Sequence, residues 1–196
     1  QNGVSDDLLI TAHAAIIAGR HFNQQASNLA KQGYMGAYPS SLGQEACQVA
    51  AALALEPADW LFPTYRDSVA VMSRGIDLAE VLSPFHGSSH CGYAPTKTHT
   101  APEATPLATH TAHAVGLAMA AKFAGDSTVA LAMCGDGSTS EGDFHEALNL
   151  AAVFEAPVVF LVQNNGYAIS TPVSRQMRAA SIAAKGEGYG MPAYRV

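Results

Sequence analysis

Hydrophobic residues recur at helical spacing through the first part of the chain. Ser5, followed by two aspartates, has the composition of a helix start, and the pattern after it predicts one long helix from Leu8 to about Lys31. Shorter stretches with the same periodicity predict three more helices. An irregular segment is predicted between the first two of these three. The three helices are Gln44–Leu55, Asp67–Ser73 and Leu78–Leu82, and the irregular segment is Ala58–Arg66.

The hydrophobic pattern changes in the second half of the chain. Thr128–Met133 and Pro157–Gln163 are continuous apolar runs bounded by turn residues, which is typical of buried parallel strands. Helices are predicted before them at Thr109–Ala124 and between them from about Gly142 to Val153. Strand, glycine turn, helix and strand in this order form a right-handed βαβ unit. The sequence therefore predicts an α/β fold with a parallel sheet and helices on both faces.

A long segment without periodicity separates these two parts. It covers residues 84–106 and is rich in Gly, Ser, Thr, Pro and His, and loops of this length inside a compact domain are usually functional or disordered. We expect a single domain over residues 1–196, made of a helical part (5–83), this loop (84–106) and a βαβ core (107–196).

Composition restricts the partners and the cellular setting. Hydrophobic residues make up 48% of the chain and charged residues only 13%, which predicts a surface covered by a protein partner. The net charge of −6 argues against nucleic acid, and no apolar stretch is long enough for a membrane span. Gln1–Asp7 does not resemble a signal peptide, and three cysteines at unrelated spacing do not form a disulfide framework. We expect a cytoplasmic protein.

Polar residues follow both predicted strands at the point where each strand ends. Gly135-Asp136-Gly137 follows the first strand and Asn164-Asn165-Gly166 the second, so Asp136 and Asn165 are 29 residues apart. A turn, a helix and a return strand take up that distance, so both side chains can reach one point beyond the sheet. Carboxylate, amide and carbonyl oxygens suit Mg²⁺, and glycines let the backbone approach a diphosphate. Either tripeptide alone would be an ordinary turn, and it is their pairing that predicts a site.

Gly-Asp-Gly followed by Asn-Asn resembles the motif that binds thiamine diphosphate. The neighbouring residues resemble one family in particular, the α subunits of the heterotetrameric 2-oxo acid dehydrogenases, from about residue 5 to the last residue. The segments that carry this resemblance are Gly135–Glu146, Asn164–Pro172, Pro63–Asp67, Gly43–Ala46 and Pro106–Thr109.

The resemblance implies a metal and cofactor site. Asp136, the side chain of Asn165 and the carbonyl of Tyr167 would hold Mg²⁺. Gly137 and Ser138 would line the diphosphate of the cofactor.

Residues outside the βαβ core complete the implied site. Tyr65 and Arg66 would reach the diphosphate from the other side, and a planar guanidinium suits phosphate oxygens. Leu107 would contact the aminopyrimidine ring. His90 resembles a histidine near the reactive end of the cofactor and is our catalytic candidate, with a solvated loop histidine as the alternative. A zinc site in this His- and Cys-containing loop is not favoured, since the ligand spacing of structural zinc motifs is missing.

The resemblance further implies the reaction and the partners. The activity would be oxidative decarboxylation of a 2-oxo acid, with acyl transfer to the lipoyl domain of the acyltransferase component. A β subunit would supply the glutamate that activates the cofactor, in an assembly of two α and two β subunits. Pro106–Thr109 and Gly186–Gly190 resemble the branched-chain enzymes, so 2-oxoisovalerate is the favoured substrate and pyruvate the alternative.

Three further points stay open at the level of sequence. Relatives continue past Tyr194–Val196, which reads as the end of a strand, so a truncated cofactor-binding chain without activity of its own is an alternative. A transketolase-like half is another, although it shares only the metal motif. In branched-chain relatives, residues matching Thr105, Pro106 and Thr109 bind potassium, but His110 replaces a glutamine ligand here and makes that ion doubtful.

Overall fold

The computed structural model describes residues 4–196. Residues 1–3, which belong to the segment that does not resemble a signal peptide, lie outside the described residues. The chain folds into two compact units, each built from two stretches of sequence. The first contains Gln1–Pro57 and Tyr65–Glu103, and the second contains Ala58–Thr64 and Ala104–Val196. The single domain expected from the sequence stays a prediction.

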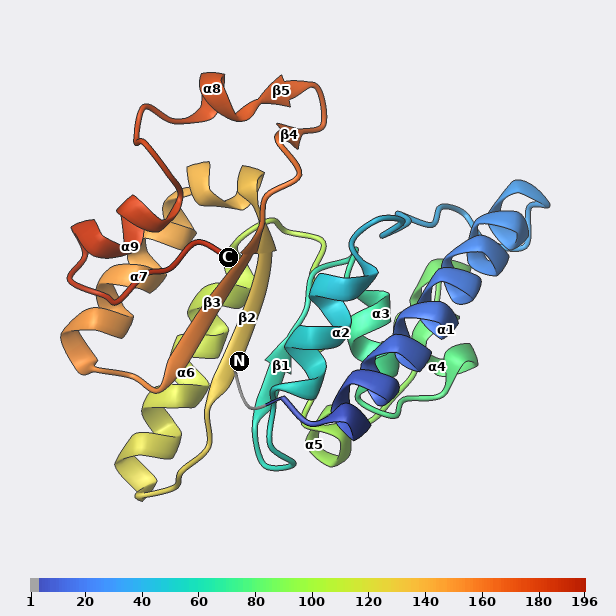
Figure 1. Ribbon diagram of the computed structural model, residues 1–196, viewed down its shortest axis with the longest axis horizontal. Coiled ribbons are helices and arrows are strands. Elements are labelled where there is room, and N and C mark those ends of the chain that lie inside the picture. The colour runs from blue at the N-terminus through green and yellow to red at the C-terminus, as the bar shows by residue number, and fades with distance from the viewer. Residues whose placement is uncertain (1–3) are drawn as a thin grey trace. The chain divides into compact units, whose positions relative to one another are not determined.

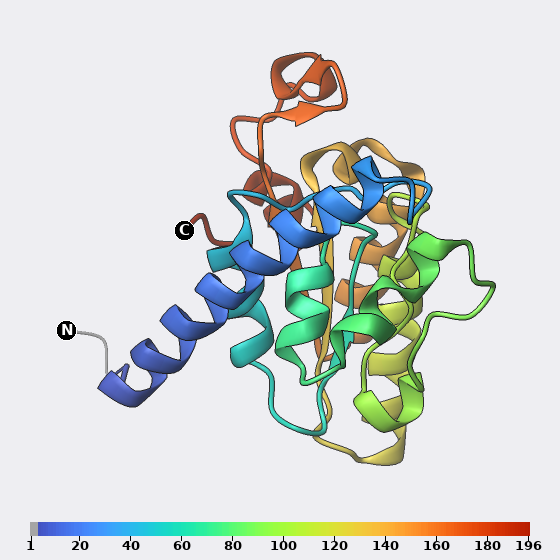
Figure 2. The same cartoon turned by 90° about the vertical axis from the view of Figure 1, so that its right-hand side faces the viewer.

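The first unit is helical and is organised by α1 (Asp6–Lys31), whose start is capped by the Ser5 hydroxyl. This helix packs against α2 (Glu45–Leu53) and α3 (Ser68–Ser73) (Figure 2). A Cβ atom at Gly19 would lie 2.7 Å from Cγ1 of Val69, so only glycine allows α1 to approach α3 this closely. Among the described residues, neither α1 nor any other helix combines the length and hydropathy needed to cross a membrane.

The remainder of the first unit is more ordered than its sequence predicts. It contains α4 (Leu78–Leu82), the 3₁₀ helix η1 (Ser83–His86) and α5 (Pro95–Thr98). The last two fall largely in the segment expected to be irregular, and four residues are too few to produce a visible period. The segment also packs inward, because Tyr93 is buried and its hydroxyl donates to the carbonyl of Ala101 at 2.8 Å.

The second unit is built on a three-stranded parallel sheet with the order β1-β2-β3 (Figure 1). Its strands are β1 (Trp60–Phe62), β2 (Ala130–Gly135) and β3 (Val158–Gln163). Two helices, α6 (Thr109–Ala124) and α7 (Gly142–Phe154), pack on one face of the sheet around Phe160. Both faces of β2 are buried, since Ala132 and Met133 are each 0% exposed. The predicted α/β class with a parallel sheet is confirmed.

Two strand predictions need correction. The segment Ala58–Arg66 is not wholly irregular, because it contains β1, which pairs in parallel with β2. Three residues carry too little pattern to be found from sequence, and β1 is fixed by distant partners: Asp59 Oδ1 accepts from Val129 N at 2.8 Å. The expected strand at Tyr194–Val196 is wrong, since residues 191–196 pair with no strand in the described part of the chain.

The chain beyond β3 forms a small hairpin and two short helices. Strands β4 (Tyr167–Ala168) and β5 (Thr171–Pro172) pair antiparallel, and α8 (Val173–Gln176) follows directly. This group lies beyond the carboxyl end of the sheet (Figure 1), and α9 (Ala183–Gly188) then returns toward α7.

Candidate functional site

The two motif-bearing strands end side by side. Gly135, the last residue of β2, is the register partner of Gln163, the last residue of β3. Asp136 and Asn165 therefore leave the sheet at the same edge. This is the edge where ligands bind in open α/β sheets.

Asp136 begins a 3₁₀ turn, η2 (Asp136–Ser140), and is 2% exposed. Its Oδ2 atom accepts a hydrogen bond from Nε2 of Gln176 at 3.1 Å, and its carbonyl accepts one from the Thr139 hydroxyl at 2.8 Å. A carboxylate offers about four acceptor positions, so the contact with Gln176 leaves capacity for a cation.

The next two residues of the turn lie close to the hairpin. A Cβ atom at Gly137 would stand 2.8 Å from Cβ of Ala168, so glycine is required for β4 to rest on η2. Ser138 is 2% exposed and lies inside the same turn. A close approach to the backbone at Gly137 was expected for a diphosphate, and in this structure Ala168 of the hairpin makes such an approach.

The segment after β3 is shaped by two consecutive side-chain turns. Oδ1 of Asn164 accepts from the N–H of Gly166, and Oδ1 of Asn165 accepts from the N–H of Tyr167, both at 3.0 Å. Gly166 has φ +88°, a conformation that glycine adopts without strain. An amide oxygen has two lone pairs, so Asn165 keeps one for a further partner. Tyr167 is 59% exposed, and the carbonyl role proposed for it stays a prediction.

Lys185 and His145 stabilise the η2 turn through contacts with Thr139. The ammonium of Lys185 donates to the carbonyl of Thr139 and to its hydroxyl, the latter at 2.9 Å, and burial lowers the pKa of Lys185. Nε2 of His145 lies 3.1 Å from the same carbonyl, and Nδ1 lies 3.0 Å from the Tyr189 hydroxyl. A carbonyl only accepts, so in the neutral tautomer that fits both contacts Nε2 of His145 donates and Nδ1 accepts from the tyrosine.

Sequence reasoning missed most of this support. Gln176 and Lys185 lie outside the motif segments that carry the family resemblance, and their contacts span 40 and 46 residues of sequence. His145 lies within the motif segment but carried no signal of its own.

Tyr65 and Arg66, the candidates for binding the diphosphate from the other side, belong to the first unit. Nη1 of Arg66 donates to the carbonyl of Ser40 at 2.8 Å, and its guanidinium lies 5.5 Å from the centre of the Tyr65 ring. The Ser40 loop is held by Asn23, whose Oδ1 accepts from the Tyr38 hydroxyl at 2.8 Å. Arg66 is therefore oriented by its neighbours while remaining partly exposed.

His90 and Leu107 lie at the surface of their own units. His90 is exposed, and its Nδ1 accepts from the N–H of Gly92 at 3.0 Å, which leaves Nε2 to carry the proton of the neutral ring. Leu107 is 39% exposed. Their catalytic and cofactor-binding roles stay predictions.

Metal ligands of the common side-chain types do not gather in the part of the chain that the structure describes. Residues 4–196 contain no group of three or more His, Cys, Asp and Glu side chains able to hold a metal ion. The oxygen set predicted for Mg²⁺ includes only one residue of those types, Asp136. Nε2 of His110, the residue that made a potassium site doubtful in the sequence, lies 2.6 Å from the carbonyl of Met133.

Comparison with known proteins identifies the family. The family model described as "Dehydrogenase E1 component" matches residues 14–196. The chain belongs to this family. An E1 relative, the 3-methyl-2-oxobutanoate dehydrogenase subunit alpha of Mycobacterium tuberculosis, is 47% identical over 191 residues, which cover 97% of this chain and 52% of the relative. The pyruvate dehydrogenase E1 component subunit alpha of Acholeplasma laidlawii is 36% identical over 190 residues, covering 97% and 55%.

This E1-family chain spans about half the length of the curated relatives that it matches. Among solved structures, transketolase from Campylobacter jejuni superposes with a TM-score of 0.68 at 20% sequence identity, covering 90% of this chain and 32% of that one. At this identity, the likeness establishes the fold alone.

Proposed function

We propose that this chain acts as the α subunit of a thiamine diphosphate-dependent 2-oxo acid dehydrogenase that prefers branched-chain substrates such as 2-oxoisovalerate. The observation that carries the proposal is the common sheet edge at which Asp136 and Asn165 leave paired strands. The 47% identity to a 3-methyl-2-oxobutanoate dehydrogenase subunit, against 36% to a pyruvate dehydrogenase subunit, supports the branched-chain preference.

The residues at this edge fit a magnesium ion and a diphosphate. They offer one buried carboxylate, one amide oxygen and main-chain carbonyls, which are hard oxygen donors, and Mg²⁺ takes its remaining ligands from water and phosphate. Gln176 contributes a buried carbonyl oxygen with no hydrogen-bond partner among the described residues. An unsatisfied acceptor at the Asp136 carboxylate is expected where a hydrated cation binds.

Each residue would contribute one part of the binding. Asp136, the Asn165 side chain and the Tyr167 carbonyl would hold Mg²⁺, and the backbone of Gly137 and Ser138 would face the diphosphate. Arg66 and Tyr65 would bind its outer oxygens, with the Ser40 carbonyl orienting the guanidinium. Leu107 would contact the aminopyrimidine, and His90 would exchange a proton near the reactive end.

Thiamine diphosphate, when bound, supplies the nucleophilic carbon and the electron sink for decarboxylation. The chain's own residues would anchor and orient the cofactor and would exclude water from the site. We further propose a β subunit that supplies the activating glutamate, an assembly of two α and two β subunits, and a lipoyl domain that receives the acyl group.

Co-expression with the β subunit tests the proposal. We expect the two chains to purify together and to decarboxylate 2-oxoisovalerate faster than pyruvate, with a requirement for thiamine diphosphate and Mg²⁺. A preference for pyruvate would instead favour the alternative substrate. Stable assembly and cofactor binding without any turnover would indicate a cofactor-binding chain that lacks activity.

A further inference from the structure

Gln176 connects the two segments that carry the proposed metal ligands. Its Nε2 atom donates to Oδ2 of Asp136 at 3.1 Å and to the carbonyl of Thr171 at 3.0 Å. Asp136 belongs to the turn after β2, whereas Thr171 belongs to the hairpin after β3. A single side-chain amide thus links the Asp136 turn to the strand that pairs with Tyr167 and Ala168.

The hairpin itself is short and lies against the η2 turn. Its two strands are two residues long, and Val173 N donates to Gly166 O at 3.0 Å within the same segment. Ala168 of the hairpin lies against Gly137 of η2, and Gln176, at the end of α8, bonds both Asp136 and the hairpin residue Thr171. Two-residue strands are marginal without support, so we expect the Gln176 contact to help hold the hairpin in place.

The second polar atom of the same amide has no partner. Oε1 of Gln176 is buried and accepts no hydrogen bond from the described residues, and it lies 3.9 Å from the position that a Cβ atom would take at Gly137. Buried acceptors in folded proteins are normally satisfied, so this one is expected to receive a donor that arrives with a ligand. Mg²⁺ retains several of its waters when it binds to protein, and these waters are donors.

We propose that Gln176 is a positioning residue for the metal: its N–H orients the Asp136 carboxylate and ties it to the hairpin, and its Oε1 accepts from a metal-bound water. Glutamine suits both tasks because an amide donates and accepts at once without charge. A glutamate of the same shape would lose the donor and repel Asp136. This inference rests on the proposed function, since it assumes the Mg²⁺ and thiamine diphosphate site.

Titration of thiamine diphosphate by calorimetry at a series of Mg²⁺ concentrations, on the assembled enzyme, tests the inference without using activity. We expect Gln176→Ala and Gln176→Glu each to raise the Mg²⁺ concentration for half-maximal cofactor binding about tenfold, the effect of one charge-assisted hydrogen bond. Gln25→Ala, an exposed glutamine on α1, is the matched control and should behave as wild type. Tighter Mg²⁺ binding by Gln176→Glu would overturn the inference, because it would make residue 176 a direct ligand.

Hydrogen exchange without ligand gives a second readout. Residues 166–176 should exchange faster in Gln176→Ala than in wild type, and equal exchange would show that the amide does not hold the hairpin. If the wild-type enzyme and both Gln176 variants bind the cofactor equally well, the inference is overturned and the proposed function is not. A wild-type enzyme that binds no thiamine diphosphate overturns the proposed function, and this inference with it.

Discussion

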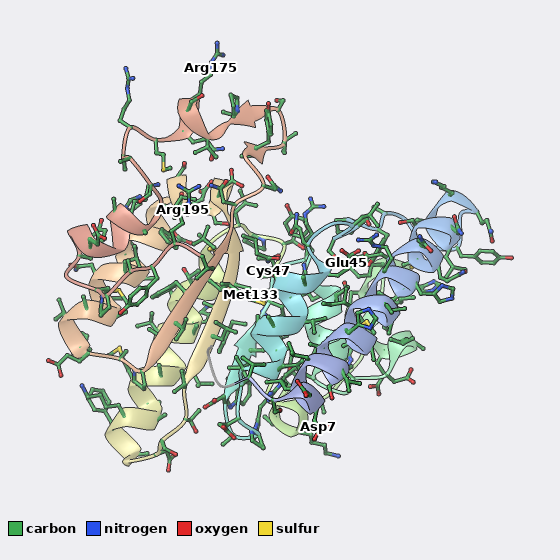
Figure 3. The ribbon with its side chains drawn as sticks, viewed as in Figure 1. Asp7, Glu45, Cys47, Met133, Arg175 and Arg195 are labelled. Atoms are coloured by element: carbon green, nitrogen blue, oxygen red, sulfur yellow. The ribbon has the colours of Figure 1, made fainter. Side chains whose placement is uncertain are left out.

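The guanidinium of Arg20 donates two hydrogen bonds to the carboxylate of Glu45, at 2.6 Å from Nε and 3.0 Å from Nη2. Glu45 stands at the start of α2 (Figure 3), is 2% exposed, and also accepts from the N–H of Gly43 at 2.8 Å. The pair joins α1 to α2. Through Asn23, which lies 3.4 Å from Glu45, it is connected to the loop that orients Arg66.

Replacing this carboxylate should destabilise the protein in a pH-dependent way. The hydrogen bond from Arg20 lowers the pKa of Glu45 below its usual 4.5. The ionised group therefore stabilises the fold above pH 4.5, and this contribution is lost as the pH falls through the lowered pKa. We expect Glu45→Gln to lower the melting temperature at pH 7 by about 5 °C. The difference in melting temperature between variant and wild type should become smaller in acid. Glu80→Gln, at an exposed position, should show neither effect.

Glu103 should give the opposite pH dependence. Burial raises the pKa of Glu103 from 4.5 to about 8, against the hydroxyl of Ser68, which donates to it at 2.8 Å. The unfolded chain then loses this proton at lower pH than the folded chain does, so stability falls as the pH rises from about 4.5 to about 8. Denaturant unfolding at pH 5 and pH 9 should show Glu103→Gln close to wild type in acid and more stable than wild type in base. Equal stability of the two proteins at pH 9 would contradict the raised pKa.

Asp136 should be indispensable for metal-dependent cofactor binding. Asp136→Ala removes the only carboxylate of the proposed set and should abolish measurable thiamine diphosphate binding in the presence of Mg²⁺. Asp136 is 2% exposed and bonded to Gln176, so Asp136→Asn is the better test of the site, because it preserves shape and packing. Calorimetry should show a large loss of affinity for both variants, with the melting temperature of the asparagine variant nearly unchanged. Unchanged affinity in Asp136→Ala would remove the site assignment.

Replacing Arg66 should weaken cofactor binding more than it lowers the maximal rate. Arg66→Lys keeps the charge but loses the planar fork, and a charge-assisted hydrogen bond contributes about 1.5–3 kcal/mol, roughly ten- to a hundredfold in affinity. We expect weaker cofactor binding in Arg66→Lys and weaker still in Arg66→Ala. The maximal rate at saturating cofactor should change less, because the proposed phosphate contact would be remote from the reacting carbon.

Cofactor titrations of activity in the assembled enzyme separate these outcomes. Arg175, which points away from α8 (Figure 3), offers a matched control as Arg175→Lys. A collapsed maximal rate with unchanged apparent affinity would place Arg66 at the substrate instead.

The isolated chain should self-associate and be catalytically silent. Large apolar side chains are exposed near the C-terminal ends of α6 and α7, including Phe123 at 71% and Val153 at 68%. Sedimentation of the chain without the proposed β subunit should show oligomers. Their dissociation constant should rise at least about tenfold in a Phe123→Glu, Val153→Glu double variant. Full decarboxylase activity from the purified chain alone would contradict the need for a partner.

The sequence predicts the fold best where a regular pattern is long. The helix expected from Leu8 and the helix Thr109–Ala124 match α1 and α6 closely, because each repeats its apolar spacing over several turns. The strand β1 was missed because three residues have no period. The helix α9 was missed because its sequence, Ala-Ala-Lys-Gly-Glu-Gly, has no apolar stripe.

The candidate site shows the same division. The common edge of β2 and β3 follows from spacing, since a βαβ unit brings successive strand ends together. Gln176 and Lys185 could not be found this way, because a polar residue of a short helix gives no sign in the sequence of the distant group that it will contact.

The pairing of β1 with β2 also has a consequence for synthesis on the ribosome. Trp60 is the register partner of Ala130, so the edge strand is translated roughly 70 residues before its neighbour exists. At about 5–20 residues per second, the apolar Trp60–Phe62 segment waits several seconds without a ladder to join. Over that interval, its apolar side chains lack their partner strand and are available to a chaperone, so slowing translation between residues 65 and 130 should lower the soluble yield.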